Sequence, residues 1–151
     1  MLDDIDRRIL RCLQNDPAAP VADLAEAARV SSGICTRRLE RMRDTGVLKG
    51  QSAIIDWVAL GYAVEVSLRI TLDKTNARAF DEFADAARAI PEVMEIQTFL
   101  GRVDTRLSVI ARDMAHYQQI YRDAILTLPH ITDIEALMHV AEIKRAGALP
   151  I

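Results

Sequence analysis

The sequence predicts an α+β protein, in which an N-terminal helix-turn-helix domain precedes a ferredoxin-like βαββαβ sandwich. Two observations support this fold class. Apolar residues recur at helical spacing in three short segments before residue 50, and from residue 62 segments of alternating polarity are interleaved with two further helical patterns. We therefore expect residues 1–50 to form the helix-turn-helix domain, residues 51–61 a connecting strand and linker, and residues 62–151 the sandwich.

The composition is that of a globular protein. Of the 151 residues, 50% are hydrophobic and 27% are charged, which is enough to fill a core. No uncharged apolar stretch approaches the roughly 18 residues needed to span a bilayer, and the acidic start is unlike a secretory signal. Two cysteines make neither a disulfide framework nor a zinc pattern. We expect a cytoplasmic protein with no membrane partner, metal or other cofactor.

Three helices are expected in the first domain. The first covers residues 3–15, with Ile9 and Leu13 facing inward and Asp6 on the polar side, and the second covers residues 20–29. Ser31 is a suitable N-cap for the third helix, which runs to Gly46, a residue typical of the position just past a helix end. Its inward face is formed by Cys35, Leu39 and Met42.

A basic patch coincides with the third helix. Residues 29–49 carry six basic and two acidic side chains in a chain of net charge −3, a pattern typical of a small nucleic-acid-binding domain. A helix in the major groove needs donors on its outer face for bases and flanking cations for phosphates. We expect Ser32, Gly33, Thr36, Arg37 and Arg41 to meet bases or the groove, and Arg38 and Arg43 to meet phosphates. The same pattern also fits a solvated polar helix.

The second domain has the element order β-α-β-β-α-β. The expected elements are a strand over 62–72, a helix over 76–89, strands over 93–100 and 104–111, a helix from Asp113, and a strand over 132–143. The first of these helices should bury Phe80, Phe83, Ala84 and Ala87. The uncovered face of the sheet would carry Leu137, Ala141 and Ile143 on its last strand, which favours a second copy of the chain as partner.

Several short motifs along the chain have the spacing of one known family. They are Leu2-Asp3, Asp6, Ile9-Leu10, Leu13, Asp16, Leu24-Ala25, the run from Ser31 to Leu39, Gly46-Val47-Leu48, Leu60-Gly61 and Gly101-Arg102-Val103-Asp104. In these motifs, and in the order of its two domains, the chain resembles the Lrp/AsnC (feast/famine) transcription factors of bacteria and archaea over essentially its whole length.

The resemblance implies a winged-type helix-turn-helix that binds double-stranded DNA at a pseudo-palindromic operator. It also implies a RAM-type C-terminal module that forms a homodimer, assembles further into tetramers or octamers, and senses a small molecule, commonly an amino acid. The implied effector-binding residues are Gly101, Arg102, Val103, Asp104, Thr105, Arg106 and His130. Arg102 or Arg106 would pair with an effector carboxylate, and Asp104 with its ammonium group. Alternatively, Gly101 and Asp104 only form a tight hairpin turn.

The chain departs from the family pattern at three places. Thr105 replaces a tyrosine or other large residue, and Arg106 occupies an apolar position. His130 replaces the glycine of a Leu-Pro-Gly-Val turn. These two departures leave open an effector other than an amino acid, or none. In the first domain, Pro20 replaces a Ser/Thr cap and Ala18 replaces an arginine, which affects the start of one helix and one phosphate contact.

Two other classes of function fit the sequence less well. Siroheme decarboxylases resemble this architecture, but their chemistry needs His and Arg groups converging on a tetrapyrrole, and no triad, phosphate-binding glycine loop or catalytic carboxylate pair is visible in the spacing. A sensing or assembly module without DNA binding is disfavoured by the four arginines retained on the third helix. The sequence therefore predicts a DNA-binding transcriptional regulator and not an enzyme.

Overall fold

The computed structural model describes residues 2–143 and 148–151. Contacts divide the chain into two compact units. The helical unit comprises Met1–Ile54 together with Ile143–Ile151, and the sheet unit comprises Ile55–Glu142. The C-terminal end of the chain, expected to belong to the sandwich, is thus grouped with the helical unit.

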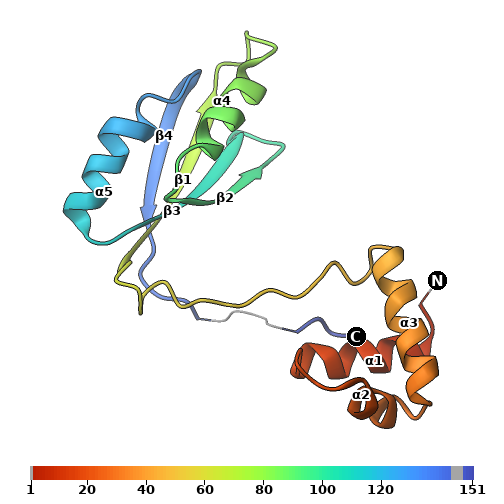
Figure 1. Cartoon of the computed structure of the whole chain (residues 1–151). Helices are drawn as coiled ribbons and strands as arrows, with labels where there is room; N and C mark the ends of the chain where they lie inside the picture. Colours follow the sequence, from red (N-terminus) through yellow and green to blue (C-terminus); the bar gives the residue numbers. More distant parts are fainter. Residues whose placement is uncertain (1, 144–147) are drawn as a thin grey trace. The chain divides into compact units, whose positions relative to one another are not determined.

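The helical unit contains the three expected helices, α1 (Asp4–Asn15), α2 (Val21–Ala28) and α3 (Ser32–Asp44) (Figure 1). Asp3 caps α1 in a capping box, because its carboxylate accepts from the Asp6 N–H while the Asp6 carboxylate accepts from the Asp3 N–H, both at 3.0 Å. Ser31 caps α3 as expected, its hydroxyl oxygen accepting from the Ile34 N–H at 3.4 Å.

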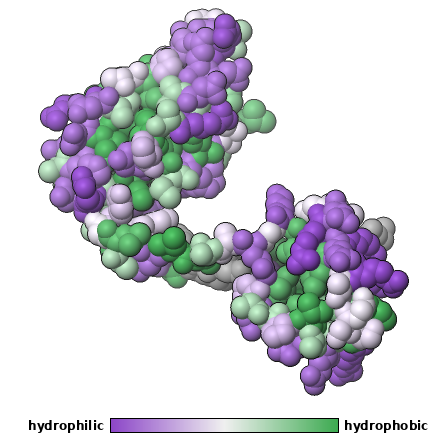
Figure 2. Space-filling view, viewed as in Figure 1, coloured by the Kyte–Doolittle hydropathy of each residue, from purple (hydrophilic) through white to green (hydrophobic). Residues whose placement is uncertain are grey.

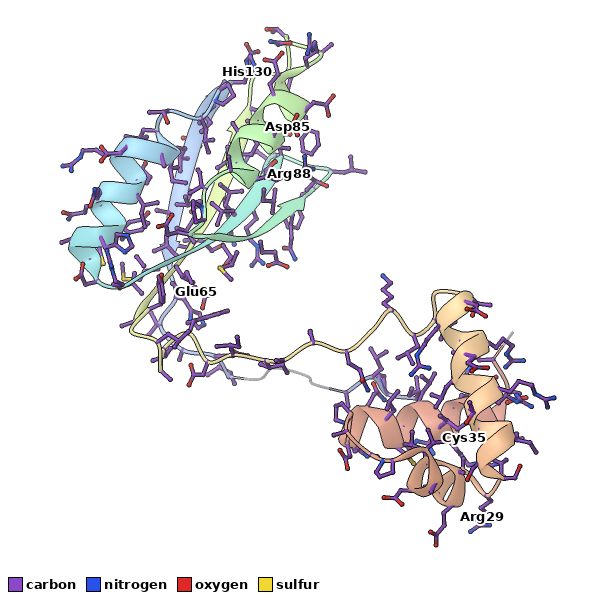
Figure 3. All side chains as sticks on the ribbon, viewed as in Figure 1. Arg29, Cys35, Glu65, Asp85, Arg88 and His130 are labelled. Atoms are coloured by element: carbon purple, nitrogen blue, oxygen red, sulfur yellow. The ribbon has the colours of Figure 1, made fainter. Side chains whose placement is uncertain are left out.

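A small apolar core holds the three helices together. It contains Ile9, Leu13, Leu24, Ala25, Ala28, Cys35, Leu39 and Met42. The expected inward face of α3 is confirmed, and Figure 3 shows Cys35 between the helices. Asp6, expected on the polar side of α1, is instead fully buried. The described residues of this unit contain no strand, so the helix-turn-helix has no wing within that part of the chain.

The prediction of a short strand within residues 51–61 is wrong, because the structure has an irregular segment followed by turns there. A strand needs a neighbour for its N–H and C=O groups, and no other segment of the described chain pairs with this one. Its large aliphatic side chains are strongly exposed, from 59% at Val58 to 94% at Ile54, whereas Trp57 is only partly exposed. Figure 2 shows the resulting hydrophobic surface along the connecting segment.

The sheet unit confirms the βαββαβ order. Its elements are β1 (Val64–Leu72), α4 (Ala79–Arg88), β2 (Val93–Thr98), β3 (Thr105–Ala111), α5 (Met114–Ile120) with a π-helical continuation over Tyr121–Ile125, and β4 (Ile131–Met138). The strands form one antiparallel sheet in the order β2-β3-β1-β4 (Figure 1). The end of β1 therefore lies beside the start of β3, with Ile70 opposite Thr105.

One face of the sheet packs against both helices. Alternate residues of β1 and β3, such as Leu68 and Leu107, are buried there against Phe83 of α4 and Ile125. Phe80 was expected in this core and is instead 42% exposed, because α4 begins at Ala79 and the buried stripe runs through Ala79, Phe83 and Ala87.

The last strand is shorter than expected. β4 ends at Met138, so Ala141 and Ile143 lie beyond it and not on the open face of the sheet. In the described part of the chain, no helix is both long and apolar enough to cross a membrane.

Candidate functional site

The outer face of α3 is exposed over its first two turns. Ser32, Gly33, Thr36 and Arg37 all lie at the surface of the helical unit. No atom lies within 4 Å of the place where a Cβ would stand on Gly33, so packing inside the chain does not require glycine there. Glycine inside a helix costs roughly 1 kcal/mol relative to alanine. Its presence therefore fits a requirement from outside the chain, such as the close approach of another molecule to the helix backbone.

Two of the arginines expected to meet DNA are bound to α1. Arg38 forms an ion pair with Asp3 and lies 3.2 Å from the Asp6 carboxylate, and Arg41 lies 2.5 Å from the other Asp6 oxygen. Asp6 is completely buried, whereas the Arg41 side chain is 48% exposed. Arg38 and Arg41 thus satisfy a buried carboxylate, and their first role is to fix α3 against α1.

This cluster predicts a specific acid dependence. The Asp6 N–H and the Arg38 guanidinium stabilise the ionised Asp3 and lower its pKa from 3.8 to about 2. Because the folded-state pKa is depressed, the stabilising effect is complete above pH 3.8 and is lost as the pH falls towards 2. We expect Asp3→Asn, which keeps a capping oxygen, to destabilise the helical unit near neutral pH but not near pH 2. Acid titration of both proteins, followed by circular dichroism, measures this difference.

Three arginines in or next to α3 are not held by α1 and so remain available to another molecule. Among the described residues, Arg29, Arg37 and Arg43 form no ion pair. Arg29 ends α2 in the left-handed conformation, at φ 58°, and lies in the turn before α3 (Figure 3). Arg29 is not among the DNA-binding residues expected from the sequence, although it falls within the basic stretch 29–49. Acidic Glu40 is exposed on the same outer face, so the surface free of negative charge is the N-terminal half of α3 and the turn before it.

The sheet unit contains an open hollow of about 400 Å³ between the segment after β1 and the turn between β2 and β3. Its walls are mainly apolar, with a few polar groups. They are formed by Leu72, Asp73, Lys74, Asn76, Ala77, Ala79, Phe80, Thr98, Phe99, Leu100 and Asp104. A concave, largely apolar site with a few polar groups is the usual form of a small-molecule site.

Asp104 is the polar centre of this hollow. One oxygen of its carboxylate accepts the Leu72 N–H at 2.9 Å, and the other lies 3.3 Å from Lys74 Nζ. The Asp104 side chain is 22% exposed, whereas that of Lys74 is 62% exposed. A carboxylate held in place beside an exposed ammonium group offers complementary partners to both ends of a zwitterion.

The other predicted effector residues are not gathered at this hollow. Arg102 and Val103 line a separate, polar hollow of about 450 Å³ with Arg69, Thr71, Asp133, Ile134 and Glu135. Arg106 forms a 2.7 Å ion pair with Glu95 on the open face of the sheet. Thr105 is fully buried, and its hydroxyl has no hydrogen-bond partner among the described residues. Gly101 is exposed in the turn and does not line either hollow.

His130 lies near the first hollow without lining it. Its Nε2 is 2.6 Å from Glu82 Oε2, and its Nδ1 is 3.5 Å from the side-chain nitrogen of Asn76, which does line the hollow. Contact with His130 holds the pKa of Glu82 below its usual value of 4.5. His130 has φ 66°, a left-handed conformation that glycine adopts without strain, which explains why a glycine is usual in this turn.

Lys74, Phe80, Phe99 and Leu100 are lining residues that the sequence analysis missed. Leu100 is fully exposed and Phe99 is 47% exposed at the tip of the hairpin. Two large apolar residues directly before the Gly101 turn were the signal that could have found Phe99 and Leu100, because such residues are unusual at an exposed turn.

The sequence of each unit matches a known domain family. Residues 2–43 match the AsnC-type helix-turn-helix domain, and residues 65–149 match the Lrp/AsnC ligand binding domain. The chain is 29% identical over 151 residues to the DNA-binding transcriptional activator DecR of Escherichia coli, covering 100% of this chain and 99% of DecR. It is 30% identical to the HTH-type transcriptional regulator Zrp of Zymomonas mobilis, covering 99% and 97%.

Solved structures resemble the whole chain as well. The AsnC family transcriptional regulator from Agrobacterium tumefaciens has a TM-score of 0.89 and 32% identity, covering 99% of this chain and 97% of that one. The transcriptional regulator NMB0573 of Neisseria meningitidis, solved in complex with L-Met, has a TM-score of 0.91 and 25% identity over the same shares. A helix-turn-helix followed by a ligand-binding βαββαβ module defines a transcriptional regulator. The chain belongs to the Lrp/AsnC family.

Proposed function

We propose that this regulator reads an operator in double-stranded DNA with the N-terminal half of α3. The free arginines and the exposed Gly33 carry the proposal, because they combine base donors with a helix backbone that a groove can approach closely. Ser32, Gly33, Thr36 and Arg37 face the bases, and Arg29 and Arg43 contact phosphates. Arg38 and Arg41 hold α3 in place and reach DNA, if at all, with donors left over from Asp3 and Asp6.

Selection of bound sequences from a random duplex library tests this proposal. A twofold-symmetric regulator should enrich a pseudo-palindrome whose half-sites are about one helical turn, or a multiple of it, apart. Affinity for the selected operator should fall steeply with salt, because phosphate contacts release counterions. Failure to enrich any sequence, or binding that does not depend on salt, would contradict DNA recognition by α3.

The sheet unit is proposed to bind a small amino acid-like effector in the hollow around Asp104. Regulators of this family bind DNA and small-molecule effectors, and the similar Neisseria protein was solved with L-Met. Asp104 would hold the ammonium group and Lys74 the carboxylate, while Phe80, Phe99 and Leu72 surround an apolar side chain. An effector with a large uncharged side chain fits these walls best.

Asp104→Asn isolates the charge at this site, because asparagine keeps an oxygen for the Leu72 N–H. We expect effector affinity to fall about tenfold or more, as a charged hydrogen bond contributes roughly 1.5–3 kcal/mol, while operator affinity stays unchanged. A thermal-shift screen of the twenty amino acids with both proteins measures the loss. Asp133→Asn, in the polar hollow with Arg102, is the matched control. A response lost in Asp133→Asn and kept in Asp104→Asn would place the effector in the other hollow.

We further propose that the open face of the sheet binds a second copy of the chain. This face carries the half-exposed Met94 and Leu137 beside the Arg69–Glu135 and Arg106–Glu95 ion pairs. A patch of mixed apolar and paired charged groups can contact its own symmetric copy, and a homodimer would supply two recognition helices for the two operator half-sites. Tetramers and octamers are built from such dimers, and sedimentation equilibrium distinguishes these states. A protein that binds chromosomal DNA in this way works in the cytoplasm.

Regulation rather than catalysis is the proposed activity. The three histidines lie beside three different carboxylates, His116 near Glu92, His130 near Glu82 and His139 near Glu65. They do not converge on one pocket, as tetrapyrrole decarboxylation would need. A Soret absorbance change on mixing with siroheme, followed by loss of carbon dioxide, would instead favour the enzyme.

A further inference from the structure

His130 occupies an unusual backbone conformation in the turn that leads into β4. Its φ of 66° is left-handed, a conformation that glycine adopts freely and that a residue with a Cβ adopts only at a cost. The side chain is nevertheless mostly buried and lies beside α4 (Figure 3). Because strained backbone positions often accompany function, the contacts of this ring indicate what His130 does.

The imidazole ring joins α4 to the wall of the hollow around Asp104. His130 Nε2 lies 2.6 Å from Glu82 Oε2 on α4, and Nδ1 lies 3.5 Å from the side-chain nitrogen of Asn76. Asn76 lines the hollow, and so does Asp73, whose N–H donates to the His130 carbonyl at 2.8 Å. His130 therefore contacts two residues of that wall without lining the hollow itself.

These contacts fix the tautomer of the neutral ring. A carboxylate accepts hydrogen bonds and does not donate them, so the proton of the neutral ring lies on Nε2, towards Glu82. The unprotonated Nδ1 then faces the amide nitrogen of Asn76 as an acceptor. The orientation of that amide is set from its other end, because Asn76 Oδ1 accepts the Arg78 N–H at 2.9 Å. With a neutral ring, both ends of the Asn76 side chain therefore have a partner.

A second proton on the ring breaks this arrangement. Protonated Nδ1 is a donor, and it then faces the amide nitrogen of Asn76, which is also a donor. Asn76 cannot turn its oxygen towards His130 without giving up the Arg78 N–H. Protonation of the ring therefore removes the contact that holds the Asn76 side chain in the wall of the hollow.

The charged groups around the ring come from two elements. At the start of α4, Arg78 Nε lies 3.4 Å from the second Glu82 oxygen, and contact with His130 lowers the pKa of Glu82. In the segment after β1, hydrogen bonds from Thr75 and, more weakly, the nearby His130 lower the pKa of Asp73. Both carboxylates are thus ionised near neutral pH, and imidazole is the type of group in this cluster that titrates between about pH 5 and 8.

We propose that His130 is a positioning residue of the effector site and makes effector affinity depend on pH: the neutral ring holds Asn76 in the wall of the hollow, and the protonated ring releases it. The inference rests on the proposed function, in which this hollow binds an amino acid-like effector. It adds a second signal, the proton concentration, which acts on the same site. Effector affinity should therefore fall as the pH falls.

Labelling of asparagine with ¹⁵N tests the contact without an effector, because the chain has two asparagines, Asn15 and Asn76. In the full-length wild type, the side-chain amide signal of Asn76 should move between about pH 8 and pH 5, whereas that of Asn15, in α1, should not. In His130→Gly, which accepts φ 66° without strain, the Asn76 signal should stay constant. A constant Asn76 signal in the wild type, or the same titration in both proteins, would overturn the proposal.

Binding of L-methionine, an amino acid with a large uncharged side chain, measures the effect on the site. We expect its affinity for the wild type to fall about three- to tenfold from about pH 8 to pH 5.5, the effect of one hydrogen bond. His130→Gly should bind with one affinity at both pH values, close to that of the wild type at the lower pH. Any titration of the amino acid itself appears equally in both proteins.

His139→Asn is the matched control. It removes another histidine beside a carboxylate, 3.2 Å from Glu65 and outside the hollow, and should follow the wild type. A wild-type affinity that does not change with pH, or an equal change in His130→Gly, would contradict the role of His130. Failure of L-methionine to bind any of the three proteins would instead contradict the proposed function, and the Asn76 signal would still decide whether His130 holds the wall.

Discussion

Replacing Asp6 by alanine is expected to lower the free energy of unfolding of the helical unit by about 3 kcal/mol, the lower end of the range for breaking a buried ion pair. Asp6 is fully buried, and its loss leaves Arg38 and Arg41 without the carboxylate that they share. It also removes one half of the capping box of α1. Urea unfolding of the variant, followed by helical circular dichroism, measures the effect, and operator binding should be lost in parallel.

Two further variants show which property of Asp6 matters. Asp4→Ala removes an exposed carboxylate in the same helical turn and should cost only a few tenths of a kcal/mol, the effect of the helix dipole. Asp6→Asn keeps an oxygen for the Asp3 N–H and should fall between the two. Equal stability of Asp6→Ala and Asp4→Ala would mean that the ion pairs of Asp6 with Arg38 and Arg41 contribute nothing to the packing of α3 on α1.

Arg37→Ala is expected to weaken operator binding by about 1–3 kcal/mol and to relax the preference at a single base pair. Arg37 is exposed on the outer face of α3 and has no ion pair among the described residues, so all its donors are available to a base. Affinities for a set of operators, each changed at one base pair, measure both effects. The folded stability of the variant should equal that of the wild type.

Arg43→Ala provides the contrast, because an arginine that binds phosphate should weaken every operator equally and reduce the salt dependence. Arg38→Ala would have been the natural choice from the sequence alone. Its ion pairs with Asp3 and Asp6 mean that it should lower stability first, so it cannot separate binding from folding. A uniform loss from Arg37→Ala, with no change in base preference, would exclude Arg37 from base recognition.

Local periodicity predicted most of the secondary structure because each element buries one regular face. Val66, Leu68 and Ile70 alternate in β1, and Cys35, Leu39 and Met42 recur in α3. The start of α4 was misplaced by three residues for a local reason. Asn76 accepts the Arg78 N–H at 2.9 Å and so forms a turn where the pattern predicted a first helical turn.

The site was less predictable, because its residues meet only in the folded chain. The helical pattern put Arg41 on the outer side of α3 and Arg38 at the edge of its apolar stripe, but it could not show that a buried carboxylate of α1 faces them. The pairing of β1 with β3 brings Lys74 to Asp104, thirty positions further along the chain. The element order predicted the neighbouring strands, but the side chains around the hollow depend on the register, which the sequence pattern did not supply.

The exposed segment that connects the two units affects the resistance of the protein to aggregation and proteolysis. Four large aliphatic side chains there are mostly exposed to solvent, those of Ile54, Ile55, Val58 and Leu60. An exposed aliphatic surface of this kind favours association with unrelated proteins. An exposed irregular segment also favours cleavage by proteases. We therefore expect limited proteolysis of the full-length protein to cut the chain first within residues 54–60.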